Sequence, residues 1–208
     1  NTMEISLTIT GTISDESIAF DTNTFEYNNE TVKKPTVTVT YVYAAGQNQT
    51  LVESTDYTVS IKDSSGNVVT EPKNAGTYTV AVTAKDGSCF TGSGTKIYTI
   101  TKATPSAPVA PTKAGSTKNS ITLTAHDGYQ YSKGGTTWQD SNVFSGLSPG
   151  TEYSFYQRVK GTDNTNESPA SAAAKFRTDA DTYAMTITLK IGDEPTVTAP
   201  TAKTGLIY

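Results

Sequence analysis

The chain holds few of the side chains that carry chemistry. His126 is the only histidine and Cys89 the only cysteine among 208 residues. A zinc site needs several His, Cys or carboxylate ligands, and a Ser-His-Asp triad would have to use His126, which stands in the turn sequence His-Asp-Gly. Because no basic partner is visible near Cys89, we expect a small buried filler rather than a nucleophile. The sequence therefore predicts no catalytic residue, no metal site and no cofactor.

The carboxylates give two weak alternatives. The run Asp163–Glu167 gathers the oxygen ligands that calcium prefers, but an ordinary polar hairpin loop has the same composition, and we favour the loop. Glycoside hydrolysis needs two carboxylates on either side of a sugar, whereas Asp15-Glu16 and Asp193-Glu194 are adjacent pairs on single turns. We therefore expect a protein that is not an enzyme.

Aromatic side chains offer a third possibility, because sugars stack on exposed aromatic faces. The chain has 12 tyrosines and one tryptophan, and the candidates for such a ligand platform are Trp138, Tyr129 and Tyr156. Alternation places Tyr129 and Tyr131 on one face of a strand and turns Tyr156 away from the face of Phe155. We expect Tyr131 and Trp138 to be core residues, which leaves the platform as an alternative.

The elements that position these residues are short strands. Apolar residues alternate with polar ones over residues 3–9, 37–43, 57–61 and 78–82, and Gly- and Asn-containing turn sequences separate the later runs. A composition rich in Thr, Val, Ile and Tyr favours strands, and no helical apolar stripe is present. The pattern predicts an all-β chain built from β-sandwiches.

A proline-rich segment divides the chain. Pro105, Pro108 and Pro111 cannot continue a central strand and favour an extended, semi-rigid backbone. We place the first domain at residues 1–103 and the second at residues 104–179. We expect residues 108–111 to form an edge strand of the second domain, and Trp138 to lie on the return strand after a tight turn.

Two turn-to-strand corners carry the family resemblances. The sequence Leu-Ser-Pro-Gly-Thr-Glu-Tyr-Ser-Phe at 147–155 resembles the corner of a fibronectin type III domain, and Asn-Ala-Gly-Thr-Tyr at 74–78 resembles that of an immunoglobulin-like sandwich. These resemblances imply that Tyr153 and Tyr78 are structural corners whose hydroxyls bond back to the backbone. The fibronectin-like family often has Trp where this chain has Ala125, and Trp138 is expected to fill that volume.

The ends of the chain resemble each other. Ile5, Leu7 and Ile9 have counterparts in residues 187–191, so residues 180–208 are read as the incomplete start of a further repeat. The tail also resembles repeats of long cell-wall proteins of Gram-positive gut bacteria. We expect residues 185–191 to lie against an exposed sheet edge or apolar patch. Because the chain starts at Asn1, it reads as a fragment of a longer protein.

Charge and hydropathy argue against two classes of function. The net charge is −4, no basic cluster exceeds Lys33-Lys34, and no apolar run is long enough to cross a bilayer, so we expect neither nucleic-acid binding nor membrane insertion. A single cysteine excludes an intramolecular disulfide, which suits bacterial surface sandwiches. We expect an extracellular, non-catalytic spacer or adhesin stalk of a secreted or cell-wall-attached bacterial protein. Its expected partners are adjacent repeats and a host glycan or matrix protein. The alternative is a carbohydrate-binding or accessory module of a secreted glycoside hydrolase.

Overall fold

The computed structural model describes residues 10–44 and 46–182, and this part of the chain is all-β. It divides into two compact units between Thr104 and Pro105, and the short segment Thr162–Asn166 belongs to the first unit. The described residues contain no helix with the length and apolar character of a membrane span. The strand expected at residues 3–9 and the tail segment 185–191 lie outside the described residues.

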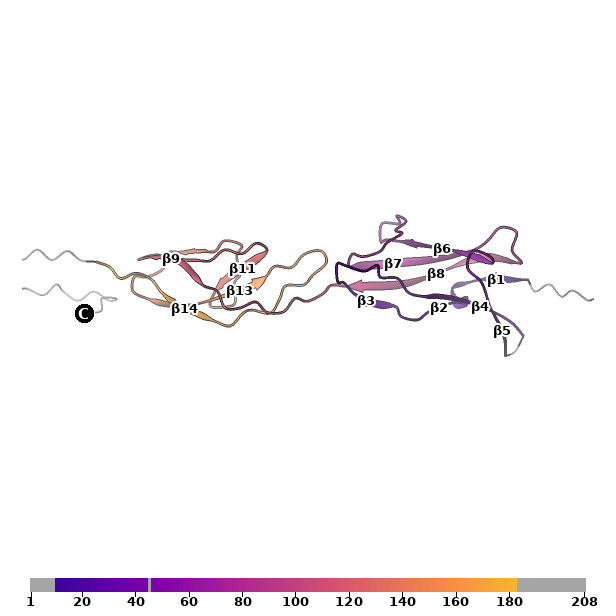
Figure 1. The fold of residues 1–208 in the computed structure, drawn as a ribbon, viewed down its shortest axis with the longest axis horizontal. Coiled ribbons are helices and arrows are strands. Elements are labelled where there is room, and N and C mark those ends of the chain that lie inside the picture. Colours follow the sequence, from indigo (N-terminus) through magenta and orange to yellow (C-terminus); the bar gives the residue numbers. More distant parts are fainter. Residues whose placement is uncertain (1–9, 45, 183–208) are drawn as a thin grey trace, which may run out of the picture. The chain divides into compact units, whose positions relative to one another are not determined.

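The first unit is a sandwich of two layers (Figure 1). Its larger sheet is built around β8 (Phe90–Thr101), which pairs antiparallel with β7 (Gly76–Ala84), which in turn pairs with β6 (Tyr57–Lys62). Two short strands, β1 (Gly11–Ile13) and β3 (Thr24–Glu26), run parallel to β8. The second layer comprises β2 (Ile18–Phe20), β4 (Val37–Ala44) and β5 (Gln47–Thr50), and a 3-10 turn (Asp15–Ser17) leads from β1 into β2.

The inward residues of both layers form the first core. Val39 of β4 and Val80 and Val82 of β7 are completely buried, and Tyr98 and Ile100 of β8 are nearly so. Buried and more exposed positions alternate along β7, which is the signature of a strand with one face on a core. The alternation predicted for residues 37–43, 57–61 and 78–82 is thus a correct guide to three strands of this unit.

The longest strand, β8, was missed by the sequence pattern because Gly92 and Gly94 interrupt its alternation. A Cβ on Gly94 would lie 2.5 Å from the carbonyl carbon of Ser14, and one on Gly92 would lie 2.8 Å from the carbonyl oxygen of Ile13. The two glycines therefore let the end of β1 and the residues after it approach the β8 backbone closely. Gly92 also has a φ of +83°, a conformation that favours glycine.

The second unit is a sandwich of two three-stranded sheets. One contains β9 (Lys113–Thr117), β10 (Ser120–Leu123) and β12 (Val143–Ser145), and the other contains β11 (Tyr129–Lys133), β13 (Glu152–Val159) and β14 (Ala174–Arg177). All pairings between these strands are antiparallel. Ile121, Leu123 and Phe155 are fully buried at the centre of its core.

Residues 108–111 do not form the expected edge strand. Val109 is 81% exposed, and its carbonyl oxygen accepts a bond of 2.9 Å from the side-chain amide of Gln157, which is itself buried. The proline spacing explains the difference, since Pro108 and Pro111 have no N–H with which to build a ladder. A side chain of β13 therefore fixes this segment in place of backbone pairing.

Candidate functional site

The corner at Tyr78 begins β7. Its hydroxyl donates a hydrogen bond of 2.8 Å to the carbonyl oxygen of Asn74, four residues earlier. The ring is 6% exposed and stacks on Tyr98, with the ring centroids 5.3 Å apart. Burial raises the pKa of Tyr78, and the carboxylate charge of Asp63 adds to the rise. The corner thus ties the turn before β7 to the centre of the first core.

The corner at Tyr153 uses its hydroxyl in the opposite sense. The Tyr153 hydroxyl oxygen accepts a bond of 3.0 Å from the backbone N–H of Ser148, five residues earlier. That N–H lowers the pKa of Tyr153, and the Lys133 ammonium, 5.3 Å from the ring centroid, contributes in the same direction. Both corners therefore bond to backbone near the start of a strand, one as a donor and the other as an acceptor.

Trp138 is not a core residue, and this corrects the expectation from sequence. It is half-buried and lies outside the core cluster of the second unit. Gln139 pairs with Tyr131 through two backbone bonds of 2.8 and 2.9 Å, so Gln139 faces the core with Tyr131, and alternation turns Trp138 outward. Trp138 therefore does not fill the volume that a Trp at Ala125 would occupy. The return segment instead lines a cavity of about 370 Å³ together with Lys133, Phe144 and Leu147.

Two of the three platform candidates share one face. On β13, Phe155 and Gln157 are buried, so Tyr156 and Arg158 point outward. The guanidinium carbon of Arg158 lies 4.5 Å from the centroid of the Trp138 ring, which places Trp138 on the same outward face. Tyr129 pairs with Val159 and belongs to the core-facing side, where it contacts His126. The structure thus places Trp138 and Tyr156 on the same outward face and Tyr129 on the other.

A polar network holds this outward face, and sequence analysis did not identify it. The Gln130 side-chain oxygen accepts bonds of 3.0 and 2.7 Å from Arg158, and its amide donates a bond of 3.0 Å to Asp140. Lys160 donates a bond of 2.7 Å to the other oxygen of Asp140, which together with Gln130 lowers the pKa of Asp140. Glu167 lies 3.8 Å from Arg158. Alternation along β11 and β13 was the available signal for the outward direction of Gln130 and Arg158, whereas the strand register places the two residues opposite each other.

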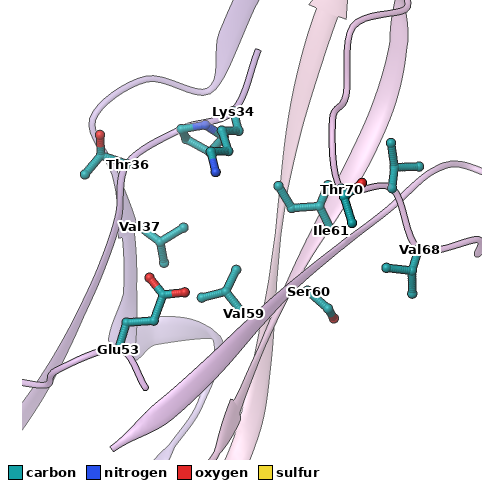
Figure 2. Close-up of a pocket in the computed structure, with 11 residues that line it drawn as sticks. Lys34, Thr36, Val37, Glu53, Val59, Ser60, Ile61, Val68 and Thr70 are labelled. Atoms are coloured by element: carbon teal, nitrogen blue, oxygen red, sulfur yellow. The ribbon is translucent and has the colours of Figure 1, made fainter. Parts of the chain in front are cut away.

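A groove opens between the layers of the first unit at the free edge of β6 (Figure 2). It has a volume of about 540 Å³, and Val37 of β4 faces Val59 of β6 across it, with Lys34 and Glu53 on either side. The carbonyls of Tyr57 and Ile61 accept bonds from Ser54 and Val69, so the Val59 backbone points to the free edge between them. The groove offers an apolar floor and one short stretch of strand edge.

The remaining candidates do not form a site among the described residues. His126 is exposed in its turn, and Cys89 is exposed rather than buried, which corrects the expectation of a core filler. In the Asp163–Glu167 run, the Asn164 side chain bonds to Asn74 and Ala75 within the first unit, and Asn166 bonds to Thr104. The described part of the chain contains no cluster of three or more His, Cys, Asp or Glu residues suited to a metal ion.

Comparisons with solved structures give distant structural likenesses. The crystal structure of the chicken CNTN1 FN1-FN3 domains matches with 16% sequence identity and a TM-score of 0.30. The match covers 80% of this chain and 64% of the CNTN1 chain, so the chain spans less than two thirds of that structure's length. No family model matches the chain. No curated protein matches it either. The tandem β-sandwich architecture therefore rests on the sheets and cores described above.

Proposed function

We propose that the chain is a non-catalytic spacer or adhesin stalk of a secreted or cell-wall-attached bacterial surface protein, whose physical task is to resist force along its length. The proposal rests on the resemblance of both corners to domains used in extracellular arrays, and on the pairing of the terminal strands in the first unit. Adjacent repeats of the same parent protein are its proposed neighbours in the chain.

The parallel pairing of β1 and β3 with β8 carries the proposal. Gly11 pairs with Phe90 at the start of β8, and Glu26 pairs with Thr101 at its end. The described chain thus enters the first unit at one end of β8 and leaves at the other end. A force between these points pulls parallel strands past one another and loads their hydrogen bonds together. An antiparallel hairpin pulled at its open end loses its bonds one at a time.

Side-chain contacts strengthen the same connection. Thr101 donates a bond of 3.0 Å from its hydroxyl to the carbonyl of Phe25, and the Thr101 carbonyl accepts one of 3.0 Å from the Tyr27 backbone. The Lys96 ammonium donates a bond of 2.8 Å to the carbonyl of Ile18. These contacts join β2 and the end of β3 to β8, so they resist the sliding of the early strands along the last strand of the unit.

Single-molecule pulling on the full chain tests the proposal. With handles at both termini, two unfolding events are expected. Unfolding of the first unit releases roughly 30 nm of contour length, and unfolding of the second unit releases roughly 20 nm. The first unit is expected to unfold at the higher force of the two. The matched control moves one handle to exposed Glu71, changed to Cys in a Cys89→Ser background, and keeps the C-terminal handle. This geometry opens the β7–β8 hairpin from its open end. Equal unfolding forces in the two geometries would refute the force-resisting role.

A further inference from the structure

The outward face of the second unit presents an aromatic ring that its surroundings hold in place. The Arg158 guanidinium lies over one face of the Trp138 indole, 4.5 Å from the ring centroid, and Trp138 remains partly exposed. Arg158 is itself fixed by two bonds to the Gln130 side-chain oxygen. A ring supported in this way loses little conformational freedom when a ligand stacks on it.

The neighbouring aromatic residue extends the same face. Tyr156 lies two residues before Arg158 on β13 and shares its outward direction. A Cβ on Gly135 would lie 3.3 Å from the Tyr156 ring, and Gly135 has a φ of +83°. Glycine at this position therefore lets the turn after β11 lie against the Tyr156 ring. The result is a surface with two aromatic side chains and a rim of polar groups.

The charges on this rim compensate one another. Arg158 lies 3.8 Å from Glu167, and Lys160 lies 2.7 Å from Asp140. A charged ligand would have to compete with these pairs, whereas a neutral ligand with hydroxyl groups would add hydrogen bonds to Asp140, Lys160 and Gln130 without displacing a charge. The face thus combines an apolar ring with donors and acceptors, and it carries no net excess of either sign.

We propose that this face binds a neutral glycan, with one pyranose ring stacked on the side of Trp138 away from Arg158 and its hydroxyls bonded by Asp140 and Lys160. The apolar C–H face of a pyranose matches an indole, and its hydroxyls match the rim. Tyr156 receives the neighbouring sugar unit. This binding role is independent of the proposed resistance to force, so either one can fail without the other.

Trp138 supplies the readout because it is the only tryptophan of the chain. The intact protein is titrated with two neutral oligosaccharides, a β-1,4-linked glucose hexamer and an N-acetylglucosamine hexamer, and with an acidic galacturonate hexamer. We expect a saturable change in Trp138 emission, and protection from acrylamide quenching, with at least one neutral hexamer and not with the acidic one. No saturable change with either neutral hexamer would overturn the proposal, and so would a response to the acidic hexamer alone.

Variants measured by calorimetry separate the face from the rest of the molecule. Trp138→Ala is expected to weaken binding of the responding hexamer by about tenfold or more, since it removes the stacking surface. The matched control is Tyr43→Ala, which removes an aromatic residue that is 47% exposed in the first unit and is expected to leave binding unchanged. Equal losses in the two variants would contradict the assignment. If Trp138→Ala does not fold, the quenching experiment on the unaltered chain still decides the question.

Discussion

The two corner tyrosines occupy equivalent positions in the two sandwiches, yet they are held differently. Tyr78 donates its hydroxyl proton to a carbonyl and stacks inside the core, whereas Tyr153 accepts from a backbone N–H in a more exposed setting. The pKa of Tyr78 is raised by burial, and that of Tyr153 is lowered by its N–H partner. A shared corner motif therefore fixes where a tyrosine stands, but the packing around it decides its hydrogen-bond role and its acidity.

Substitutions of one glycine in each unit should give the largest difference in the free energy of unfolding. Gly94→Ala on β8 is expected to destabilise the first unit by about 2–3 kcal/mol, because the new Cβ meets the Ser14 and Asp15 backbone. Gly115→Ala on β9 meets nothing within 4 Å and is expected to change stability by less than about 0.5 kcal/mol. Denaturant unfolding followed by far-UV circular dichroism compares them. Similar losses would show that the close approach of the segment after β1 to β8 is not required.

Removing the two corner hydroxyls should give a smaller difference in the free energy of unfolding between the units. Tyr78→Phe is expected to cost about 1–1.5 kcal/mol, since its bond is partly buried, and Tyr153→Phe about 0.5 kcal/mol, since water reaches the Ser148 N–H. Trp138 emission reports the unfolding of the second unit, and far-UV circular dichroism reports the unfolding of both units. A larger loss for Tyr153→Phe would reverse the comparison between the corners.

Raising the pH above 10 should change the stability of the two units in opposite directions through their tyrosines. Burial raises the pKa values of Tyr57, Tyr78 and Tyr98 above the ordinary value of 10.0. Between that value and the folded pKa, the unfolded chain has lost protons that the folded first unit retains, so the stability of this unit falls as pH rises above 10. The lowered pKa of Tyr153 acts in the opposite sense, because its stabilising effect is present above its unfolded pKa.

Denaturation midpoints at pH 8 and pH 11 measure this contrast, with Tyr98→Phe as the control. The Tyr98 ring is 1% exposed, and its hydroxyl has no hydrogen-bond partner among the described residues. The variant removes one ionisable group from the first core, and its midpoint is expected to depend less on pH than that of the unaltered chain. A second unit that loses more stability than the first at pH 11 would contradict the comparison.

Residue order alone determines much of this protein. The two-residue period at 37–43, 57–61 and 78–82 predicts β4, β6 and β7, since one buried face imposes that period. The corner sequences place Tyr78 and Tyr153, because a turn and the strand after it are local structures. The alternation that separates Tyr156 from Phe155 also belongs to the sequence, because neighbouring side chains on a strand point to opposite faces.

Tertiary structure alone decided the rest. β8 carries two glycines that break its pattern, and the close approach of the end of β1 and the residues after it explains them. Trp138 looks like a core residue by type, but the pairing of Gln139 with Tyr131 turns it onto Arg158. In both cases the deciding contact joins residues on different strands. Local propensity cannot specify such a contact, because the register between strands is fixed only when both faces of the sheet have found their neighbours.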